Sequence, residues 1–359
     1  MAATVAVIGV PGTRGVEAAL RACAVAGVSA APVADRAQLA RGWRAATAVL
    51  VASSAHAWLA GVPRRASVAV LDEALGSDVD AWQLAVQIGA ETVFAPDQDS
   101  RRLVEWLALA GEPAGPPGQV VGVAGGCGGA GASTFAAALA LRAGSPSSRV
   151  TLVDADPAGG GIDVLLGVEA TPGTRWPGLR ASRGVVAADA LADALPRADG
   201  VAVLSWVSSG GEAQPVQALP VEAMEAVLSA AIRGSDLVVV DLPRGPDAAA
   251  EHVAARADRV ILVAPASVRA VAASAAAAAR WAEAGADVGL VVRHPGPADL
   301  TPATVADALG LPLLGVVPVD SRLAHLGDRG RFVAALRRSP LGAAAAAISA
   351  QLTARPDAA

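Results

Sequence analysis

Residues 119–144 read QVVGVAGGCGGAGASTFAAALALRAG and give the strongest structural signal in the chain. An apolar run, Gln119–Gly125, leads directly into a glycine-rich loop, Gly126–Thr134, and a helix-forming segment follows. A strand, a glycine-rich loop that ends in two hydroxyl residues, and a helix form the structural context of a phosphate-binding P-loop. The glycines let backbone N–H groups converge on an anion, and the helix N-terminus adds its dipole and free donors.

Apolar runs continue on the C-terminal side of this loop. They contain many β-branched and few polar residues, which is typical of strands buried on both faces of a parallel sheet. The Ala-rich segment Val268–Ala284 is expected to be one of the covering helices. The predicted strands are Gln119–Gly125, Arg149–Asp156, Gly200–Trp206, Asp236–Pro243, Arg259–Pro265, Val288–Arg293 and Leu313–Pro318.

The N-terminal part shows a second alternation of strands and helices. Five strand–helix units in the first 110 residues imply another parallel sheet with helices on both faces. The predicted strands are Thr4–Val10, Val28–Val33, Thr47–Ser53, Ser67–Asp72 and Thr92–Pro96. The predicted helices are Gly15–Ala26, Arg36–Trp43, Ala55–Ala60, Val79–Ile88 and Asp99–Leu109. In size and order this region resembles a response-regulator receiver (CheY-like) domain.

Residues 111–119, GEPAGPPGQ, separate the two regions. Their prolines and glycines cannot continue a helix and suit an extended linker. We therefore predict an α/β protein with two doubly wound parallel-sheet domains, at residues 1–110 and 120–359.

The composition excludes several classes of protein. The 359 residues carry a net charge of −5, and all 28 basic residues are arginine because the sequence contains no lysine. An acidic balance disfavours strong nucleic-acid binding. The two cysteines, Cys23 and Cys127, are too few for a disulfide framework or a zinc site. Without a basic leader or an 18-residue apolar run, the chain is expected to be cytoplasmic.

The glycine-rich loop resembles the deviant Walker A motif K-G-G-x-G-K-[ST]-T of the MinD/ParA ATPases. Cys127 matches the first lysine, which in that family reaches across a dimer, and Ala132 matches the second, which contacts the β- and γ-phosphates. The remaining motif positions are matched by Gly128, Gly129, Ala130, Gly131, Ser133 and Thr134. The resemblance implies that Gly128–Thr134 bind ATP or ADP with Mg²⁺.

Acidic residues follow in the order that the family has them. The resemblance implies that Asp156, in the sequence Asp154-Ala155-Asp156, positions the attacking water, and that Ser133 and Asp241 hold Mg²⁺, Asp241 through water. For Asp156 and Asp241 a simple capping role is the alternative. Asp163 also matches an acidic family position, although a structural role is the simpler interpretation. Arg293 stands where relatives place an adenine-reading Asn.

Loss of both lysines separates binding from catalysis. One missing charge-assisted hydrogen bond costs about 1.5–3 kcal/mol, roughly tenfold to a hundredfold in affinity. Each missing preorganised donor typically costs about 10²–10³ in rate. We therefore expect weak nucleotide binding and little or no ATP hydrolysis. Arg244 or Arg269 could approach the site, but a guanidinium does not occupy the space of a lysine ammonium.

Loss of the second lysine resembles the CpaE/TadZ branch of the family, which positions Flp/Tad pilus machinery and carries an atypical receiver domain. Loss of both resembles the actinobacterial septum site-determining (Ssd, CpaE-like) subgroup. The first domain is a pseudo-receiver by the same reasoning, because its first strand ends in Gly9-Val10-Pro11, its third in Ala52-Ser53-Ser54, and no lysine exists. Both domains keep a fold and lose chemistry, which favours a scaffold.

The resemblance implies a spatial regulator of septal or polar machinery. Its partners would be proteins of a pilus, secretion or cell-division assembly, at the pole, the septum or the inner membrane face, and a homodimer is compatible with the family. A slow ATP-dependent dimerising switch and a ParA-like DNA-partitioning protein are the alternatives. The arginines near the C-terminus (Arg329, Arg331, Arg337 and Arg338) leave DNA binding as a possible function. Membrane contact would be peripheral at most.

Overall fold

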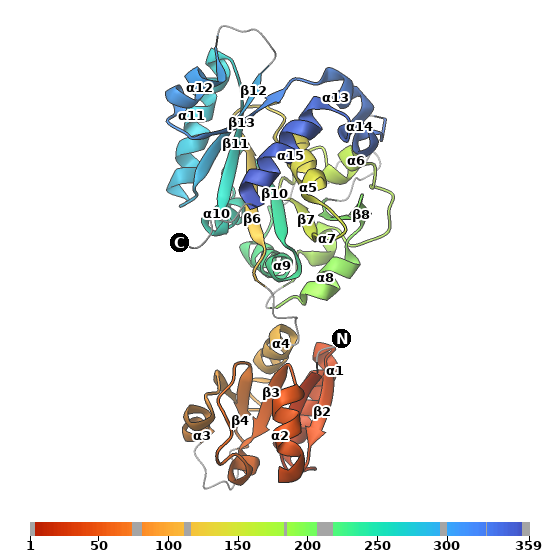
Figure 1. The fold of residues 1–359 in the computed structure, drawn as a ribbon, viewed down its shortest axis with the longest axis vertical. Helices are drawn as coiled ribbons and strands as arrows, with labels where there is room; N and C mark the ends of the chain where they lie inside the picture. Colours follow the sequence, from red (N-terminus) through yellow and green to blue (C-terminus); the bar gives the residue numbers. More distant parts are fainter. Residues whose placement is uncertain are drawn as a thin grey trace. The chain divides into compact units, whose positions relative to one another are not determined.

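The computed structural model describes residues 4–73, 81–110, 116–182, 185–206, 218–294, 300–327 and 329–353. The chain divides into two compact units, with the main division between residues 115 and 116. Each unit is an α/β sandwich with its own sheet (Figure 1). The first five residues of the predicted linker, 111–115, lie outside the described residues.

The first unit is built on a five-stranded, wholly parallel sheet with the strand order β2-β1-β3-β4-β5. Its central strand β3 is buried at every position, as its uninterrupted apolar sequence predicts. The strands are β1 (Thr4–Ile8), β2 (Ser29–Val33), β3 (Ala48–Ala52), β4 (Val68–Leu71) and β5 (Thr92–Phe94). This confirms the predicted receiver-like order.

Helices cover both faces of this sheet. One core cluster lies against α2, η1 and α3, and a second lies against α1 and α4. Cys23 is buried in the second cluster, and this burial raises the pKa of its thiol to about 11. The predicted helix Ala55–Ala60 is instead a short 3₁₀ helix that begins at Ser53. The elements are α1 (Arg14–Ala26), α2 (Arg36–Ala45), η1 (Ser53–Trp58), α3 (Ala81–Ile88) and α4 (Ser100–Ala110).

The second unit contains an eight-stranded sheet with the order β13-β12-β11-β6-β10-β7-β9-β8. All seven predicted strands are present, and they pair in parallel. The two-residue edge strand β8 was not predicted and pairs antiparallel with β9 through a tight turn at Asp199 and Gly200, both with positive φ. The strands are β6 (Gln119–Gly125), β7 (Val150–Asp154), β8 (Arg197–Ala198), β9 (Val201–Leu204), β10 (Leu237–Leu242), β11 (Arg259–Pro265), β12 (Val288–His294) and β13 (Leu313–Pro318).

The helix after the glycine-rich loop, α5 (Ala132–Ala143), forms the centre of the core. Phe135–Leu141 are all buried, because α5 packs on β6, β7 and β10 and is covered by α15 (Pro340–Thr353). Pro340 is the first residue of α15, a position that proline tolerates because its missing N–H would have no partner there. The two C-terminal helices therefore pack on the unit.

The remaining helices are α6 (Ile162–Leu166), α7 (Trp176–Leu179), α8 (Ala188–Ala194), α9 (Val221–Gly234), α10 (Ala248–Arg256), α11 (Val268–Glu283), α12 (Pro302–Leu309), α13 (Ser321–Gly327) and α14 (Phe332–Leu336). Among them, α9, α10 and α11 pack on β10, β6 and β11 in the middle of the sheet. No helix in the described part of the chain is both long and apolar enough to cross a membrane. The sheet places the carboxyl ends of β6, β7 and β10 side by side, and this is the edge at which ligands of open α/β sheets bind.

Candidate functional site

The glycine-rich loop Gly126–Thr134 lies between buried strand β6 and buried helix α5. Its first residue is fixed by two neighbours: the Gly126 amide donates to the Val263 carbonyl on β11 at 2.9 Å, and a Cβ on Gly126 would lie 2.0 Å from Ser274 Oγ on α11. A side chain at Gly126 would therefore force α11 away from the loop. The sequence needs glycine here for close packing.

Two further glycines turn the loop back toward the sheet. Gly129 and Gly131 have φ values of 68° and 89°, a region that side chains disfavour. The first-turn amides of Ala132, Ser133 and Thr134 have no intrahelical acceptors, as at the start of any helix. The N-cap residue Gly131 has no side chain that could accept a hydrogen bond from them. Amides in this position are donors for an anion.

A cavity of about 220 Å³, which we call the phosphate cavity, lies in front of these amides. Its lining includes Cys127, Gly129–Thr134, Asp156, Asp241 and Arg244. The structure thus brings together all the predicted site residues except Gly128, which does not line the cavity. The cavity is open and polar, and it is large enough for a chain of phosphates.

Two strand-end carboxylates stand opposite each other at this edge. Asp241 on β10 pairs in register with Asp154 on β7, and both are buried. Burial and the neighbouring charges of Asp154 and Asp156 together raise the pKa of Asp241 to about 8, although a hydrogen bond from the Ser133 hydroxyl opposes the rise. Asp241 and Ser133 therefore face each other at the place where a divalent cation would neutralise the crowded negative charge.

The partners of Asp154 hold its carboxylate in place. It accepts hydrogen bonds from the Ile162 amide at 3.0 Å, the Ser205 hydroxyl at 2.9 Å and the Asp156 amide at 3.1 Å. Its own carbonyl accepts from the Trp176 indole at 2.6 Å. Burial raises the pKa of Asp154 to about 6 despite these bonds. Asp154 is thus a structural residue that organises the loop after β7.

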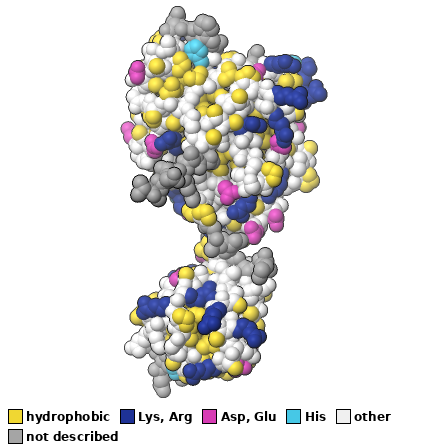
Figure 2. Space-filling view, viewed as in Figure 1, with side chains coloured by type: hydrophobic (Ala, Val, Ile, Leu, Met, Phe, Trp, Pro, Cys, Tyr) yellow, Lys and Arg dark blue, Asp and Glu magenta, His cyan; other side chains and the backbone are white. Residues whose placement is uncertain are grey.

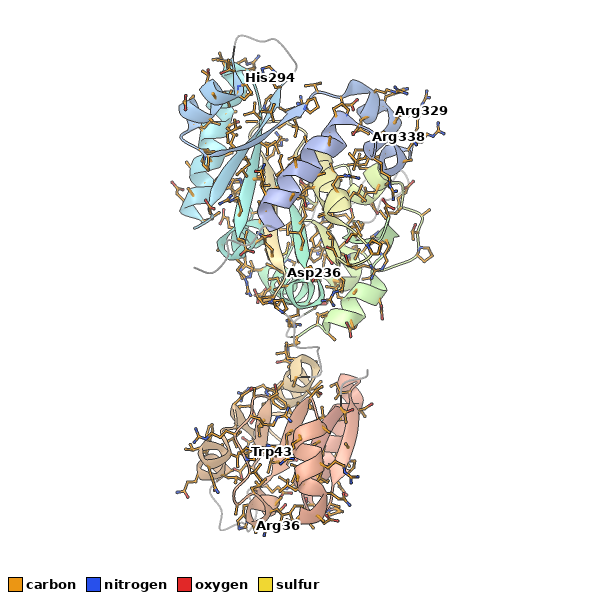
Figure 3. All side chains as sticks on the ribbon, viewed as in Figure 1. Arg36, Trp43, Asp236, His294, Arg329 and Arg338 are labelled. Atoms are coloured by element: carbon orange, nitrogen blue, oxygen red, sulfur yellow. The ribbon has the colours of Figure 1, made fainter. Side chains whose placement is uncertain are left out.

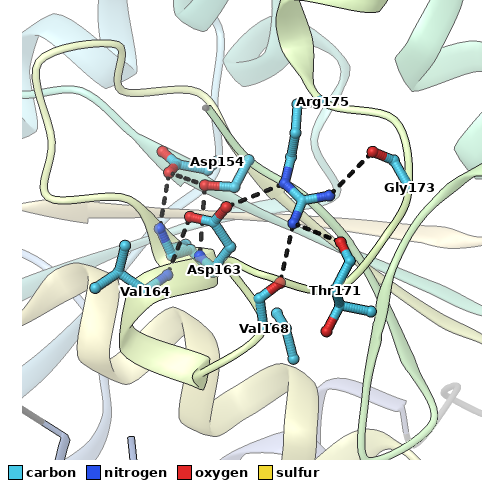
Figure 4. A network of polar contacts seen from close by, with 9 residues as sticks. Asp154, Asp163, Val164, Val168, Thr171, Gly173 and Arg175 are labelled. Atoms are coloured by element: carbon cyan, nitrogen blue, oxygen red, sulfur yellow. Dashed lines mark hydrogen bonds and ion pairs between the residues drawn. The ribbon is translucent and has the colours of Figure 1, made fainter. Parts of the chain in front are cut away.

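Asp163 serves a structural role as well. Its Oδ2 lies 3.0 Å from Arg175 Nε in an ion pair whose side chains are 2% and 9% exposed. Figure 4 shows the same guanidinium donating to the carbonyls of Val168, Thr171 and Gly173. Arg175 was not predicted from the sequence, because a spacing of 12 residues gives no sign of an ion pair with Asp163.

Asp156 differs from its two neighbours because it lines the phosphate cavity and is only half-buried. Its Oδ1 accepts from the Ala158 amide at 3.0 Å. One carboxylate oxygen is thus used locally, and the side chain still faces the cavity. This placement is compatible with the predicted water-positioning role.

Two arginines from outside the loop reach it. Arg244, just after β10, lines the phosphate cavity, and its Nη1 would lie 3.0 Å from a Cβ on Gly128. Arg293 on β12 donates from Nη1 to the Gly129 carbonyl at 3.0 Å. Arg269, the other arginine considered from the sequence, is exposed on α11 and is absent from the lining of this cavity.

A second cavity of about 160 Å³ adjoins the first. The two share Gly131 and Thr134, and the second is otherwise lined largely by apolar residues, with Arg293 and Pro318 among its walls. A predominantly apolar hollow beside a phosphate cavity can hold the flat ring of a base. Arg293, which stands where relatives place an adenine-reading Asn, lines this second cavity.

The donors for a metal ion are sparse. In the described ranges, no group of three or more His, Cys, Asp and Glu side chains is arranged to hold a metal ion. Magnesium in such sites is held by one or two protein oxygens together with phosphate oxygens and water. Ser133 and Asp241 would supply the protein oxygens, so the residues present fit Mg²⁺ only together with a nucleotide.

The first unit places Glu73 at the edge where a receiver holds its acidic residues. Its carboxylate accepts from the Gly15 amide of α1 at 2.9 Å and from the Ser54 amide after β3 at 3.2 Å. Burial raises the pKa of Glu73, but hydrogen bonds from Ser54, Thr13 and Gly15 outweigh it and lower the pKa overall. The Glu73 carboxylate thus accepts hydrogen bonds from the amides at the start of α1 and directly after β3. This role of Glu73 was not predicted from the sequence, although an acidic residue just after β4 could have indicated it.

Of the four arginines near the C-terminus, one is engaged in an ion pair and two line a common hollow. Arg337 forms an ion pair with Asp199 at 2.6 Å. Arg331 and Arg338, together with Arg322, line a hollow of about 670 Å³ beside α13 and α14. Figure 2 shows the basic side chains gathered there, and Figure 3 shows Arg329 and Arg338 at the outer edge.

Comparison with known proteins agrees with this architecture. A family described as "Rv3660c-like, CheY-like N-terminal domain" matches residues 14–118. Over 331 residues the chain is 40% identical to two Mycobacterium tuberculosis proteins, the uncharacterized proteins MT3760 (strain CDC 1551 / Oshkosh) and Rv3660c (strain ATCC 25618 / H37Rv). The match covers 90% of this chain and 91% of each relative.

Solved structures resemble the second unit. The septum site-determining protein MinD from Pyrococcus horikoshii OT3, complexed with Mg-ADP, is 19% identical with a TM-score of 0.54, over 65% of this chain and 95% of that one. The MinC:MinD cell division protein complex of Aquifex aeolicus is 19% identical with a TM-score of 0.55, and the match covers 66% of this chain and 97% of that one. At these identities the likeness shows the fold alone. The identity to the two mycobacterial proteins shows that this chain, with its receiver-like N-terminal domain and MinD/ParA-like second domain, belongs to the Rv3660c-like family.

Proposed function

We propose that this chain is a spatial regulator of the MinD/CpaE type, a scaffold that binds nucleotide weakly and hydrolyses little or no ATP. One observation carries the proposal: the loop keeps its phosphate cavity and its free amides, while Cys127 and Ala132 occupy both lysine positions. Main-chain donors support ground-state binding. Few positive charges are left to stabilise a transition state, so catalysis is expected to suffer more than binding.

The site residues have separate roles in this proposal. The amides of Gly129 and Gly131–Thr134 bind phosphate, whereas the Ala130 amide donates to the Cys127 carbonyl at 3.3 Å. Ser133 and Asp241 hold Mg²⁺, Asp241 through water. Asp156 orients water if any hydrolysis occurs. The bound Mg²⁺ would neutralise phosphate charge. A protonated Asp241 would have to release its proton to take part, so binding is expected to improve as the pH rises toward and above the pKa of Asp241, about 8.

The fold of the second unit, which resembles that of MinD, supports the proposed role in positioning. The solved relatives include a septum site-determining protein and a complex of MinD with MinC. We assign the chain to the CpaE/TadZ-like branch, close to the septum site-determining subgroup. Its partners would be proteins of a pilus, secretion or cell-division assembly, with the chain recruited from the cytoplasm to the pole, the septum or the inner membrane face.

Two other functions make different predictions. A slow dimerising switch needs a cation to reach the partner's phosphates, and Cys127 cannot supply one, so size-exclusion chromatography with and without Mg-ATP separates it from a scaffold. A DNA-partitioning protein needs free basic residues, and Asp199 already pairs with Arg337. Salt-dependent DNA binding that is lost in an Arg329→Ala, Arg331→Ala, Arg338→Ala variant would favour this function.

Fluorescent fusions in a mycobacterial host test the proposal. We expect the wild-type protein at septa or poles, and the same pattern for Asp241→Asn, because a scaffold does not require a working nucleotide cycle. A wild-type signal spread evenly through the cell would contradict a positioning role. Loss of localisation in Asp241→Asn, with normal protein levels, would favour the nucleotide-dependent switch.

A further inference from the structure

The loop itself provides no positive side chain, yet Arg244 lies at its phosphate cavity. The Arg244 side chain lines the cavity together with Ser133, Asp156 and Asp241, and its Nη1 approaches Gly128. Arg244 is exposed, and it forms no side-chain ion pair with the residues that the structure describes. A guanidinium at the wall of a cavity that also contains helix N-terminal amides can contribute positive charge to the binding of an anion there.

The backbone that carries Arg244 is held firmly from α11. Arg280 donates from Nη1 to the Arg244 carbonyl at 2.8 Å and from Nη2 to the Pro243 carbonyl at 3.2 Å. The Arg280 guanidinium itself lies 4.1 Å over the ring centroid of Trp281, which is fully buried. This contact fixes the start of the Arg244 side chain, so Arg280 is a positioning residue for Arg244.

The order of features along the loop indicates which phosphate Arg244 meets. The base-sized cavity joins the phosphate cavity at Gly131 and Thr134, and Arg293 bounds it. Arg244 does not line that cavity and lies at Gly128, earlier in the loop. A nucleotide that enters with its base beside Arg293 would extend its last phosphate toward Arg244.

We infer that Arg244 replaces the missing lysines as the cation for the terminal phosphate of a nucleoside triphosphate, and that it makes the site prefer triphosphate over diphosphate. This inference rests on the proposed nucleotide binding and adds a residue and a selectivity to it. A guanidinium can bind two phosphate oxygens at once, which suits a terminal phosphoryl group with three free oxygens.

Isothermal titration of the full chain with Mg²⁺ and either the non-hydrolysable imidotriphosphate analogue of ATP or ADP tests the inference. Arg244→Ala should weaken analogue binding by about tenfold to a hundredfold, the loss of one charge-assisted hydrogen-bonded contact, and change ADP binding by less than about threefold. Arg280→Ala should shift analogue binding in the same direction by a smaller factor. Arg269→Ala is the matched control, an exposed arginine outside the phosphate cavity, and should leave both affinities unchanged.

Three results would overturn the inference. Equal analogue affinity in wild type and Arg244→Ala removes the role of Arg244 and leaves the proposed nucleotide binding intact. Equal weakening of analogue and ADP places Arg244 at an inner phosphate instead of the terminal one. No binding of either ligand by the wild type contradicts the nucleotide binding of the proposed function, and the inference falls with it. Circular dichroism of each variant checks that it is folded.

Discussion

The buried carboxylates of the P-loop unit predict an unusual dependence of stability on pH. Asp241 has a pKa raised from 3.8 to about 8, because it is buried and stands beside Asp154 and Asp156. Between these two values the folded protein keeps a proton that the unfolded chain has already released. Since stability falls with pH wherever the folded state binds more protons, the P-loop unit should become less stable as the pH rises toward 8.

The size of the effect follows from one proton. One extra bound proton changes the free energy of unfolding by about 1.4 kcal/mol per pH unit at most. Asp154 contributes in the same direction up to its pKa of about 6, so above that pH Asp241 acts without it. We expect the free energy of unfolding to decrease by about 1–3 kcal/mol between about pH 6 and about pH 8.

Asp241→Asn provides the perturbation, because the amide keeps the shape of the side chain and cannot ionise. Urea unfolding of wild type and variant, followed by tryptophan fluorescence across this pH range, measures the free energy of unfolding. The variant should lose most of the slope and exceed the wild type in stability near pH 8. Asp307→Asn, an exposed carboxylate on α12, is the control and should keep the wild-type slope. Parallel slopes in wild type and Asp241→Asn would refute the reasoning.

Three further outcomes follow from other contacts. Arg175→Ala should destabilise the P-loop unit by about 3–5 kcal/mol in urea unfolding, because it leaves Asp163 charged and buried, and a loss under 1 kcal/mol would contradict this. Ala132→Lys should tighten ADP binding by about tenfold to a hundredfold in titration calorimetry, and unchanged affinity would show that the lysine position is not what limits binding. The lowered pKa of Glu73 means that its carboxylate should stabilise the first unit above the pKa of the unfolded chain and lose that effect in acid. Glu73→Gln should therefore flatten the acid side of the profile of unfolding free energy against pH, and an unchanged profile would exclude this role.

The sequence predicted the strands well and their ends less well. Runs such as those of β6, β10 and β11 are apolar throughout because both faces are buried, and this makes them visible without any knowledge of neighbours. The strand β8 escaped prediction because two residues carry no periodicity, although the Asp199-Gly200 pair marks a hairpin turn.

The loop was identifiable from its motif, whereas its surroundings were not. Glycines, hydroxyls and a following helix occur together in sequence, so the phosphate cavity followed from local pattern. Arg293 reaches Gly129 across 164 residues, and Arg280 reaches Arg244 across 36, so each contact depends on how α11 and β12 pack against the loop. Arg244, one of the two arginines expected to approach the site, lines the phosphate cavity because of that packing, whereas Arg269 does not line it.

The central claim is that the loop binds nucleotide while it scarcely hydrolyses it. Titration calorimetry of ATP and ADP with Mg²⁺, paired with a phosphate-release assay on the same preparation, tests this most directly. We predict weak binding and a turnover indistinguishable from that of an Asp156→Ala, Asp241→Asn double variant. Turnover at the rates usual for MinD-type ATPases, abolished in the double variant, would contradict the account.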